Sequence, residues 1–192
     1  MESKEKNTKE KILEEALKLF AQSGYMGTSM NDIASKLGVT KAALYKHYKS
    51  KQEILDSIID KMNELDIERV KLYEMPEGDL EKVTAEYKET AFDKIKQFTK
   101  VQFLHWTEEE FSSCFRKMLT LEQYREPQMA QLYQNYLASG PLAYMEALFS
   151  GMLGDAEKAR QTALDFYGPV FLLYSIYDGA EDKSYVIKLL EE

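Results

Sequence analysis

The chain has 192 residues, of which 44% are hydrophobic and 30% are charged, and its formal net charge is −8. This composition is typical of a globular chain with a sizeable core and excludes an intrinsically disordered protein. No apolar run reaches the roughly 18 residues of a membrane span, the first residues lack the apolar region of a signal peptide, and the single cysteine, Cys114, cannot form an internal disulfide, so we expect a cytoplasmic location and no membrane partner.

Two helices are predicted at the N-terminus. The first begins after a cap at residues 7–8, carries apolar residues at the three-to-four spacing of a buried face, and ends near Gly24. The second is capped by Thr28 or Ser29 and ends at Gly38, because glycine readily adopts the left-handed conformation that terminates helices.

A third helix is predicted from Thr40 to Tyr48, which makes a helix-turn-helix with the second. Leu44 and Tyr48 lie four residues apart on one face, and we expect them to pack under the second helix together with Val39. The opposite, outward face carries four residues, which we call the reading face: Lys41, Ala42, Tyr45 and Lys46.

The reading face has the chemistry that a DNA groove requires. Ala42 permits close approach, Tyr45 offers a hydroxyl and a ring edge, and the lysines complement phosphates or guanine acceptors. Donors at the neighbouring helix ends are candidates for contacts to the DNA backbone: Thr28, His47 and Lys51.

Charge is divided unevenly along the chain. Residues 1–52 hold 10 lysines and 6 acidic residues, a balance of +4, and the other 140 residues hold 15 basic and 27 acidic groups, a balance of −12. A basic N-terminal segment on an acidic body suggests that the segment meets a polyanion, although surface lysines that only solvate a helix give the same pattern.

Residues 11–55 resemble the DNA-binding domain of the TetR family of bacterial transcriptional regulators. The resemblance depends on residue types at the family's spacing: Phe20, Gly24, Tyr25, Thr28, Ile33, Ala34, Gly38, Val39, Leu44, Tyr45, His47, Lys51 and Leu55. Two positions depart from the family pattern, Ala42 where glycine is frequent and Lys46 where an aromatic residue is frequent.

The resemblance implies a homodimer whose third helices read successive major grooves of a palindrome, with an effector pocket in the C-terminal body. It implies that these residues contact DNA: Thr28, Thr40, Lys41, Ala42, Tyr45, His47 and Lys51.

The body is predicted to be helical throughout. Ser50 with Glu53 matches a capping box at the start of a fourth helix that runs toward Met75. Asp79 caps a long helix that reaches Trp106.

Four more helices complete the predicted body. Thr107 with Glu110 matches a second capping box. Pro127 starts a long helix with a kink at Pro141, Asp155 caps a further helix that ends at Gly179, and residues 181–192 form a short final helix.

Aromatic residues of the body are candidates for an apolar pocket that holds a small-molecule effector. The alternative is that they form only core, and that His105 is a surface or capping residue. The candidate ligand-binding residues are Phe92, Phe103, His105, Trp106, Phe115, Tyr133, Tyr136 and Tyr167.

The penultimate helix, residues 155–179, is apolar on nearly every side, so we expect its outer side to pack against a second copy of the chain. The resemblance favours this dimer, because these regulators pair through C-terminal helices in a four-helix bundle. The alternative is a helix buried wholly within its own domain. The candidate dimerisation residues are Phe166, Val170, Phe171, Tyr174 and Tyr177.

Catalytic and cofactor signals are weak. Two histidines, His47 and His105, and one thiol cannot assemble a compact His/Cys metal site, and neither a phosphate-binding glycine loop nor a nucleophile elbow is present in the sequence. We therefore expect no enzyme, no metal and no cofactor, with Cys114 acting as a small hydrophobe or, alternatively, as an oxidation sensor.

These observations predict an all-α chain with a DNA-binding domain at residues 1–52 and a helical effector-binding and dimerisation domain at residues 53–192. The predicted function is that of a ligand-responsive transcriptional regulator, a repressor that binds a palindromic operator in double-stranded DNA and is released by a small molecule. Two alternatives are a sequence-nonspecific DNA-binding protein and a small-molecule carrier or enzyme without DNA coupling.

Overall fold

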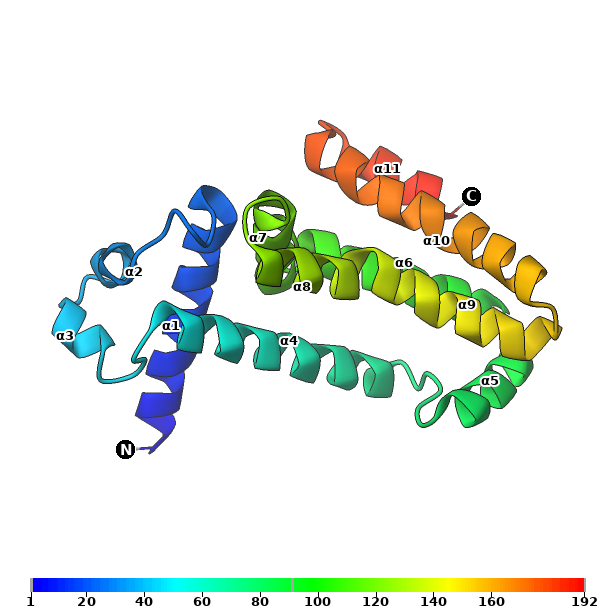
Figure 1. Ribbon diagram of the computed structural model, residues 1–192, viewed down its shortest axis with the longest axis horizontal. Coiled ribbons are helices and arrows are strands. Elements are labelled where there is room, and N and C mark those ends of the chain that lie inside the picture. Colours follow the sequence, from blue (N-terminus) through cyan, green and yellow to red (C-terminus); the bar gives the residue numbers. More distant parts are fainter. Residues whose placement is uncertain (1, 91, 192) are drawn as a thin grey trace. The chain divides into compact units, whose positions relative to one another are not determined.

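A computed structural model describes residues 2–90 and 92–191, and the side chains of residues 7–90 and 93–191. Every regular element in these ranges is an α-helix, as Figure 1 shows, which confirms the all-α prediction. The chain forms two compact units. The N-terminal unit comprises Met1–Glu68 and Glu110–Ala130, and the C-terminal unit comprises Arg69–Glu109 and Gln131–Glu192.

The N-terminal unit is built around one long helix. Helix α1 packs against both α7 and α2, and α2 packs against α3. Its core is a set of fully or almost fully buried apolar side chains that includes Leu17, Phe20, Ile33, Leu44, Ile58 and Leu119. The helices of this unit are α1 (Glu2–Ser23), α2 (Met30–Lys36), α3 (Lys41–Leu44), the larger part of α4 (Lys51–Leu72) and α7 (Glu110–Glu122).

Helix α3 is shorter than predicted, because it ends at Leu44 instead of Tyr48. Beyond it, the amides of Lys46 and His47 donate to the carbonyls of Ala43 and Leu44, three residues back. Hydrogen bonds with this three-residue spacing form turns, so residues 45–47 are turns and not regular α-helix.

The C-terminal unit is a helical bundle. Helices α9 and α10 pack side by side, α5 packs on α9, and α11 packs on α6 and α10. The sharp connection from α9 to α10 uses Gly154 at φ 68° followed by Asp155, whose carboxylate accepts the first amides of α10. The helices are α5 (Leu80–Glu89), α6 (Phe92–Glu108), α8 (Pro127–Leu137, whose first turn belongs to the N-terminal unit), α9 (Ser139–Leu153), α10 (Ala156–Gly179) and α11 (Lys183–Glu191).

Two predicted features of α5 to α7 are wrong. The helix capped by Asp79 does not run to Trp106, because it ends at Thr90, whose backbone is extended. Thr107 does not cap α7. It lies inside α6, is buried, and its hydroxyl donates to the carbonyl of Phe103, 2.8 Å away. Because Thr107 has the helical backbone of α6, it does not take the extended conformation that an N-cap residue of α7 would need.

The long helix predicted to start at Pro127 is also divided. It breaks at Ala138, whose backbone is non-helical at φ −127° and ψ −97°, instead of kinking at Pro141. Pro141 lies in the first turn of α9, where a proline is tolerated because its missing N–H has no helical partner to lose.

The predicted domain boundary at residue 52 falls inside α4, which is continuous from Lys51 to Leu72. Packing also places α7 with the N-terminal helices. The functional division into residues 1–52 and 53–192 remains a prediction. None of the described helices combines the length and the hydropathy that crossing a membrane would require.

Candidate nucleic-acid interface and effector region

The α2–α3 segment is fixed by local capping. Ser29 caps α2 in a reciprocal capping box: its hydroxyl accepts the Asp32 amide, and the Asp32 carboxylate accepts the Ser29 amide at 2.8 Å. Gly38, at φ 67°, makes the turn. Thr40 then caps α3 by accepting the amide of Ala43 at 3.2 Å. These contacts produce the predicted helix-turn-helix from residues close together in sequence.

The inner side of this segment is anchored by two side chains. Leu44 is 1% exposed and Tyr48 is 4% exposed, as the helical spacing predicts. Val39 is 44% exposed and does not join them. It lies in the turn, where its amide donates to the carbonyl of Ala34 and its side chain is left outside the core.

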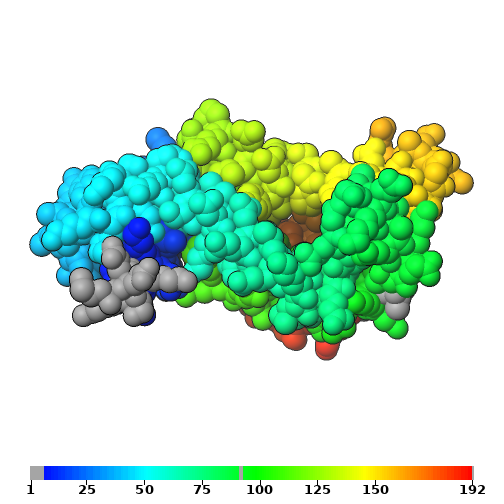
Figure 2. Space-filling view, turned by 90° about the horizontal axis from the view of Figure 1, so that it is seen from below, coloured from blue at the N-terminus to red at the C-terminus, as the bar shows by residue number. Residues whose placement is uncertain are grey.

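The reading face lies on the outer side, and Figure 2 shows the α2–α3 segment, in light blue, at the molecular surface. Lys41, Ala42 and Lys46 are exposed, and Tyr45 is partly exposed. The ammonium of Lys41 is 5.8 Å from the centroid of the Tyr45 ring. The structure therefore brings these four residues together on one accessible surface, with a cation over an aromatic ring.

Thr28 and Lys51 are engaged within the protein. Thr28 is 3% exposed, and its hydroxyl donates to the carbonyl of Gly24 at 2.9 Å. The Lys51 ammonium donates to the carbonyls of Tyr25, at 2.6 Å, and Thr28, at 2.7 Å. Both side chains thus close the turn between α1 and α2. The predicted phosphate contacts of these two residues have no support from this geometry.

His47 is half-buried at the end of the segment. Among the described residues, its Nδ1 atom is buried without a hydrogen-bond partner. Thr40 is exposed, with its hydroxyl already used as the α3 cap. Any DNA contact by either residue is still a prediction.

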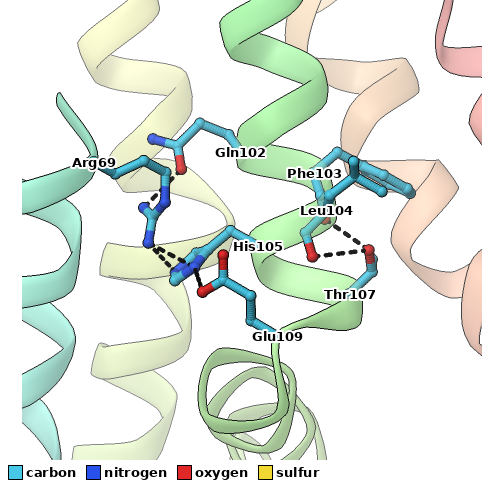
Figure 3. Close-up of polar contacts among 7 residues, drawn as sticks. All are labelled: Arg69, Gln102, Phe103, Leu104, His105, Thr107 and Glu109. Atoms are coloured by element: carbon cyan, nitrogen blue, oxygen red, sulfur yellow. Dashed lines mark hydrogen bonds and ion pairs between the residues drawn. The ribbon is translucent and has the colours of Figure 1, made fainter. Parts of the chain in front are cut away.

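In the C-terminal unit, His105 is fully buried in a polar chain that also contains Arg69, Gln102 and Glu109 (Figure 3). Arg69 donates to Gln102 Oε1 at 2.9 Å, and a guanidinium nitrogen lies 2.7 Å from His105 Nε2. Nδ1 of His105 is 2.6 Å from a carboxylate oxygen of Glu109. The same guanidinium nitrogen also lies 2.6 Å from Nδ1, so the imidazole is held between a guanidinium, which only donates, and a carboxylate, which only accepts.

Several predicted pocket residues of this unit pack as core. Phe103 is fully buried, stacks on Tyr174 with ring centroids 5.2 Å apart, and meets Tyr177 edge-on at 5.7 Å. Trp106 meets Tyr136 edge-on at 6.2 Å. Such packing leaves little of these rings free for a ligand.

The remaining predicted pocket residues are dispersed. Tyr167 is half-buried and donates its hydroxyl to the Leu137 carbonyl at 2.8 Å, and Tyr133 is half-buried. Phe115 is fully buried on α7 in the N-terminal unit, so it does not share a unit with the others. The side chain of Phe92 lies outside the described residues.

A surface groove of about 890 Å³ lies between α5 and α9, and none of the predicted aromatic residues lines it. Its centre is formed by small residues where the helices approach closely: a Cβ added to Gly151 would lie 2.8 Å from a methyl carbon of Thr84. This groove was not predicted, because only small residues at helical spacing in α9 indicate it in the sequence. Its lining is Leu80, Glu81, Thr84, Ala85, Lys88, Glu89, Ala147, Ser150 and Gly151.

Comparison with known proteins identifies the N-terminal segment. The family model for bacterial regulatory proteins of the tetR family matches residues 12–58. Over these residues, the chain is similar to the TetR family. The matched range contains α2, α3 and the whole reading face, so the similarity covers the helix-turn-helix of the structure.

Two curated relatives match the same TetR segment. The chain is 46% identical over 46 residues to the biofilm operon icaADBC HTH-type negative transcriptional regulator IcaR of Staphylococcus epidermidis. It is 41% identical over 51 residues to IcaR of Staphylococcus aureus strain Newman. The matches cover 24% and 27% of this chain, and only 25% and 27% of the respective relatives.

Solved structures extend the likeness of fold to almost the whole chain. A transcriptional regulator from Aquifex aeolicus VF5 aligns with a TM-score of 0.65 at 22% identity and covers 96% of this chain and 95% of its own. AibR, solved in complex with isovaleryl coenzyme A and operator DNA, aligns with a TM-score of 0.62 at 20% identity over 94% of both chains. At these identities the likeness concerns the fold alone.

The predicted dimerisation residues divide into two groups. Val170, Tyr174 and Tyr177 are at most 8% exposed and pack within their own unit, whereas Phe171 is 39% exposed and Phe166 is half-buried. The outer side of α10 carries apolar residues that the prediction did not include: Leu164, Leu172 and Ile176.

Proposed function

We propose that this chain is a ligand-responsive transcriptional regulator that binds a palindromic DNA operator as a homodimer. The observation that carries the proposal is the exposed reading face of the helix-turn-helix. The segment is anchored by other residues, Leu44 and Tyr48, which are buried. The positive balance of residues 1–52 supports a DNA partner, because it attracts phosphate while the acidic body orients the molecule.

Repression is the proposed mode of action. The relatives that match the DNA-binding segment are described as negative transcriptional regulators. A repressor needs only to occupy its operator, and a dimer does so when its two reading faces are about 34–36 Å apart, one turn of DNA. We expect this regulator to act in the bacterial cytoplasm, where its DNA lies, and to work by binding, without catalysis.

Release by a small molecule is proposed by analogy of fold, because AibR was solved with both isovaleryl coenzyme A and operator DNA. An effector that binds residues 53–192 would change the separation of the two reading faces, so that both half-sites could not be engaged together. The affinity for the operator would then fall without any change in the reading face itself.

Dimerisation is proposed through the outer side of α10. Phe171, Leu172 and Ile176 are between 38% and 58% exposed there, together with Leu164 about two turns before Phe171. Exposed apolar residues that repeat along one side of a long helix favour a self-complementary interface across a twofold axis. This revises the predicted interface, because Val170, Tyr174 and Tyr177 are already covered by their own unit.

Selection of random duplex DNA by the purified protein, read by sequencing at about 0.15 M salt, tests the proposal, because this salt weakens nonspecific attraction. We expect an enriched palindrome and a loss of affinity for it in Tyr45→Ala. Binding without enrichment would favour the sequence-nonspecific alternative. An absence of DNA binding by a folded dimer would favour the carrier or enzyme alternative.

A further inference from the structure

Glu122, near the end of α7, has an unusual environment for a carboxylate. Its side chain is 0% exposed, and neither carboxylate oxygen has a hydrogen-bond partner among the described residues. The nearest cation in an ion pair is Arg125, whose guanidinium is 3.6 Å from Oε1 and whose side chain is 62% exposed. A buried carboxylate without hydrogen bonds destabilises the folded protein, so its presence at this position requires another explanation.

The carboxylate is held against the turn that follows α1. A Cβ built on Gly24 would lie 1.9 Å from Glu122 Oε1, so the carboxylate occupies the space that any other residue at position 24 would fill. Gly24 has φ 80°, the left-handed region that favours glycine. Two features of this turn therefore require glycine, its backbone conformation and the proximity of Glu122.

The same turn binds Lys51, the first residue of α4. The ammonium of Lys51 donates to the carbonyls of Tyr25 and Thr28 and lies 4.3 Å from the centroid of the Tyr25 ring. A neutral amine could donate to both carbonyls, but only the protonated amine also makes a cation–π contact and strengthens both hydrogen bonds by its charge. This clamp joins the start of α4 to the turn that leads into α2.

The charges that act on Lys51 come from two other helices. Burial lowers the pKa of Lys51, and the carboxylates of Glu122 on α7 and Asp32 on α2 oppose this effect. Without Glu122, burial would be opposed mainly by Asp32, which lies on the exposed surface of α2.

We propose that Glu122 is a positioning residue for DNA binding, whose negative charge holds the Lys51 ammonium between the carbonyls of Tyr25 and Thr28 and thereby fixes the start of α4 against the helix-turn-helix. The inference rests on the proposed function. It explains why a carboxylate is kept at a buried position where it makes no hydrogen bond.

Glu122→Gln tests this role, because it removes the charge and keeps the shape. Operator affinity is measured between pH 7 and pH 9.5 at constant salt, for the wild type and the variant. Lys51 of the variant is expected to lose its proton at a lower pH, so the decline in affinity with rising pH should begin at a lower pH than in the wild type. Near pH 7, where Lys51 is charged in both proteins, the affinities should agree within about threefold.

Three further variants make the test specific. Glu122→Met, which also removes the charge but cannot hydrogen-bond, should show the same earlier decline. In a Lys51→Met background, Glu122→Gln should not shift the pH dependence of operator affinity, because the titrating ammonium of Lys51 is absent. Glu157→Gln, the same charge change at an exposed position of α10, should leave the pH profile unchanged.

An affinity loss of equal size at every pH would show that Glu122 acts only through packing and would overturn the inference, as would a profile identical to that of the wild type. If the wild-type protein selects no DNA, the proposed function fails. The charge coupling is then judged by an NMR titration of Lys51 Nζ, in which an unchanged midpoint in Glu122→Gln would refute it independently.

Discussion

The hydroxyl of Tyr167 on α10 donates to the backbone carbonyl of Leu137, the last residue of α8, at 2.8 Å. In a continuous helix this carbonyl would accept the amide of residue 141, but residue 141 is proline and has no N–H. Tyr167 therefore satisfies an acceptor that Pro141 leaves without a helical partner. The burial that accompanies this contact raises the pKa of Tyr167 well above its ordinary value.

Tyr167→Phe should destabilise the protein by about 1–2 kcal/mol, because it leaves a carbonyl of the bundle without a donor. Urea unfolding measures the difference. The matched control is Tyr144→Phe on α9: the hydroxyl of Tyr144 has no hydrogen-bond partner among the described residues, so its removal should change stability by less than about 0.5 kcal/mol. Equal effects of the two substitutions would contradict this assignment.

Gly24→Ala should be far more harmful than Gly38→Ala. Both glycines have positive φ, 80° and 67°, so each substitution meets the cost of the left-handed conformation, about 1–2 kcal/mol. At Gly38 an added Cβ meets nothing within 4 Å, whereas at Gly24 it collides with the Glu122 carboxylate. We expect Gly24→Ala to cost at least about 2 kcal/mol more in thermal or urea unfolding. Similar losses at the two positions would show that the carboxylate moves aside freely.

Lys46→Ala should weaken binding to all DNA sequences and reduce the slope of log affinity against log salt by about 0.9, the value for one phosphate contact. Lys46 is exposed on the reading face. Lys158→Ala, at an exposed position on α10, removes the same charge and serves as the control with an unchanged slope. If Lys46→Ala instead changed the preferred base at one operator position, Lys46 would be a base contact.

The Ser29–Asp32 capping box should make α2 sensitive to acid. Hydrogen bonds from the Ser29 hydroxyl and amide hold the pKa of Asp32 below its ordinary value. Because this pKa is lowered on folding, the stabilisation is present above the ordinary carboxyl pKa and is lost as the pH falls through the folded value. A carboxyl NMR titration of Ser29→Ala should show the Asp32 midpoint moving up toward the ordinary value, and an unmoved midpoint would refute the capping role.

Leu172→Glu should convert the proposed dimer to monomer, because it places a charge among the exposed apolar residues of α10. Sedimentation analysis gives the mass. Leu153→Glu is a close control, since Leu153 is 50% exposed and Leu172 is 58% exposed, but it lies on α9. A dimer that survives Leu172→Glu and dissociates with Leu153→Glu would show that the interface lies on α9 and not on α10.

Local capping chemistry explains which elements were predictable from the sequence. Ser29, Thr40, Asp79 and Asp155 were recognisable caps, and each accepts backbone amides at a helix start. These signals depend only on residues within three positions of the cap. Thr107 had the same pattern, but it is buried within α6, and burial depends on residues far away in sequence.

The exposed reading face was predictable because a helix-turn-helix is fixed by short-range spacing. The burial of residues and the helix ends in the body were less predictable. Residues of α10 are apolar on several sides, so periodicity could not distinguish Tyr174, which is buried, from Leu172, which is exposed. The helix break at Ala138 has no local breaker at that residue, and the acceptor that Pro141 leaves open is satisfied by Tyr167, which is remote in sequence.

The separation of anchoring and outward residues in segment 40–48 has an evolutionary consequence. The fold of this segment depends on Thr40, Leu44 and Tyr48, whereas Ala42 and Lys46 face outward and support none of the packing described for it. Substitutions at the outward positions can therefore accumulate without unfolding the domain. Duplicated copies of such a gene could acquire new operators through a few point mutations, so paralogous regulators should diverge first at these positions and retain the anchoring ones.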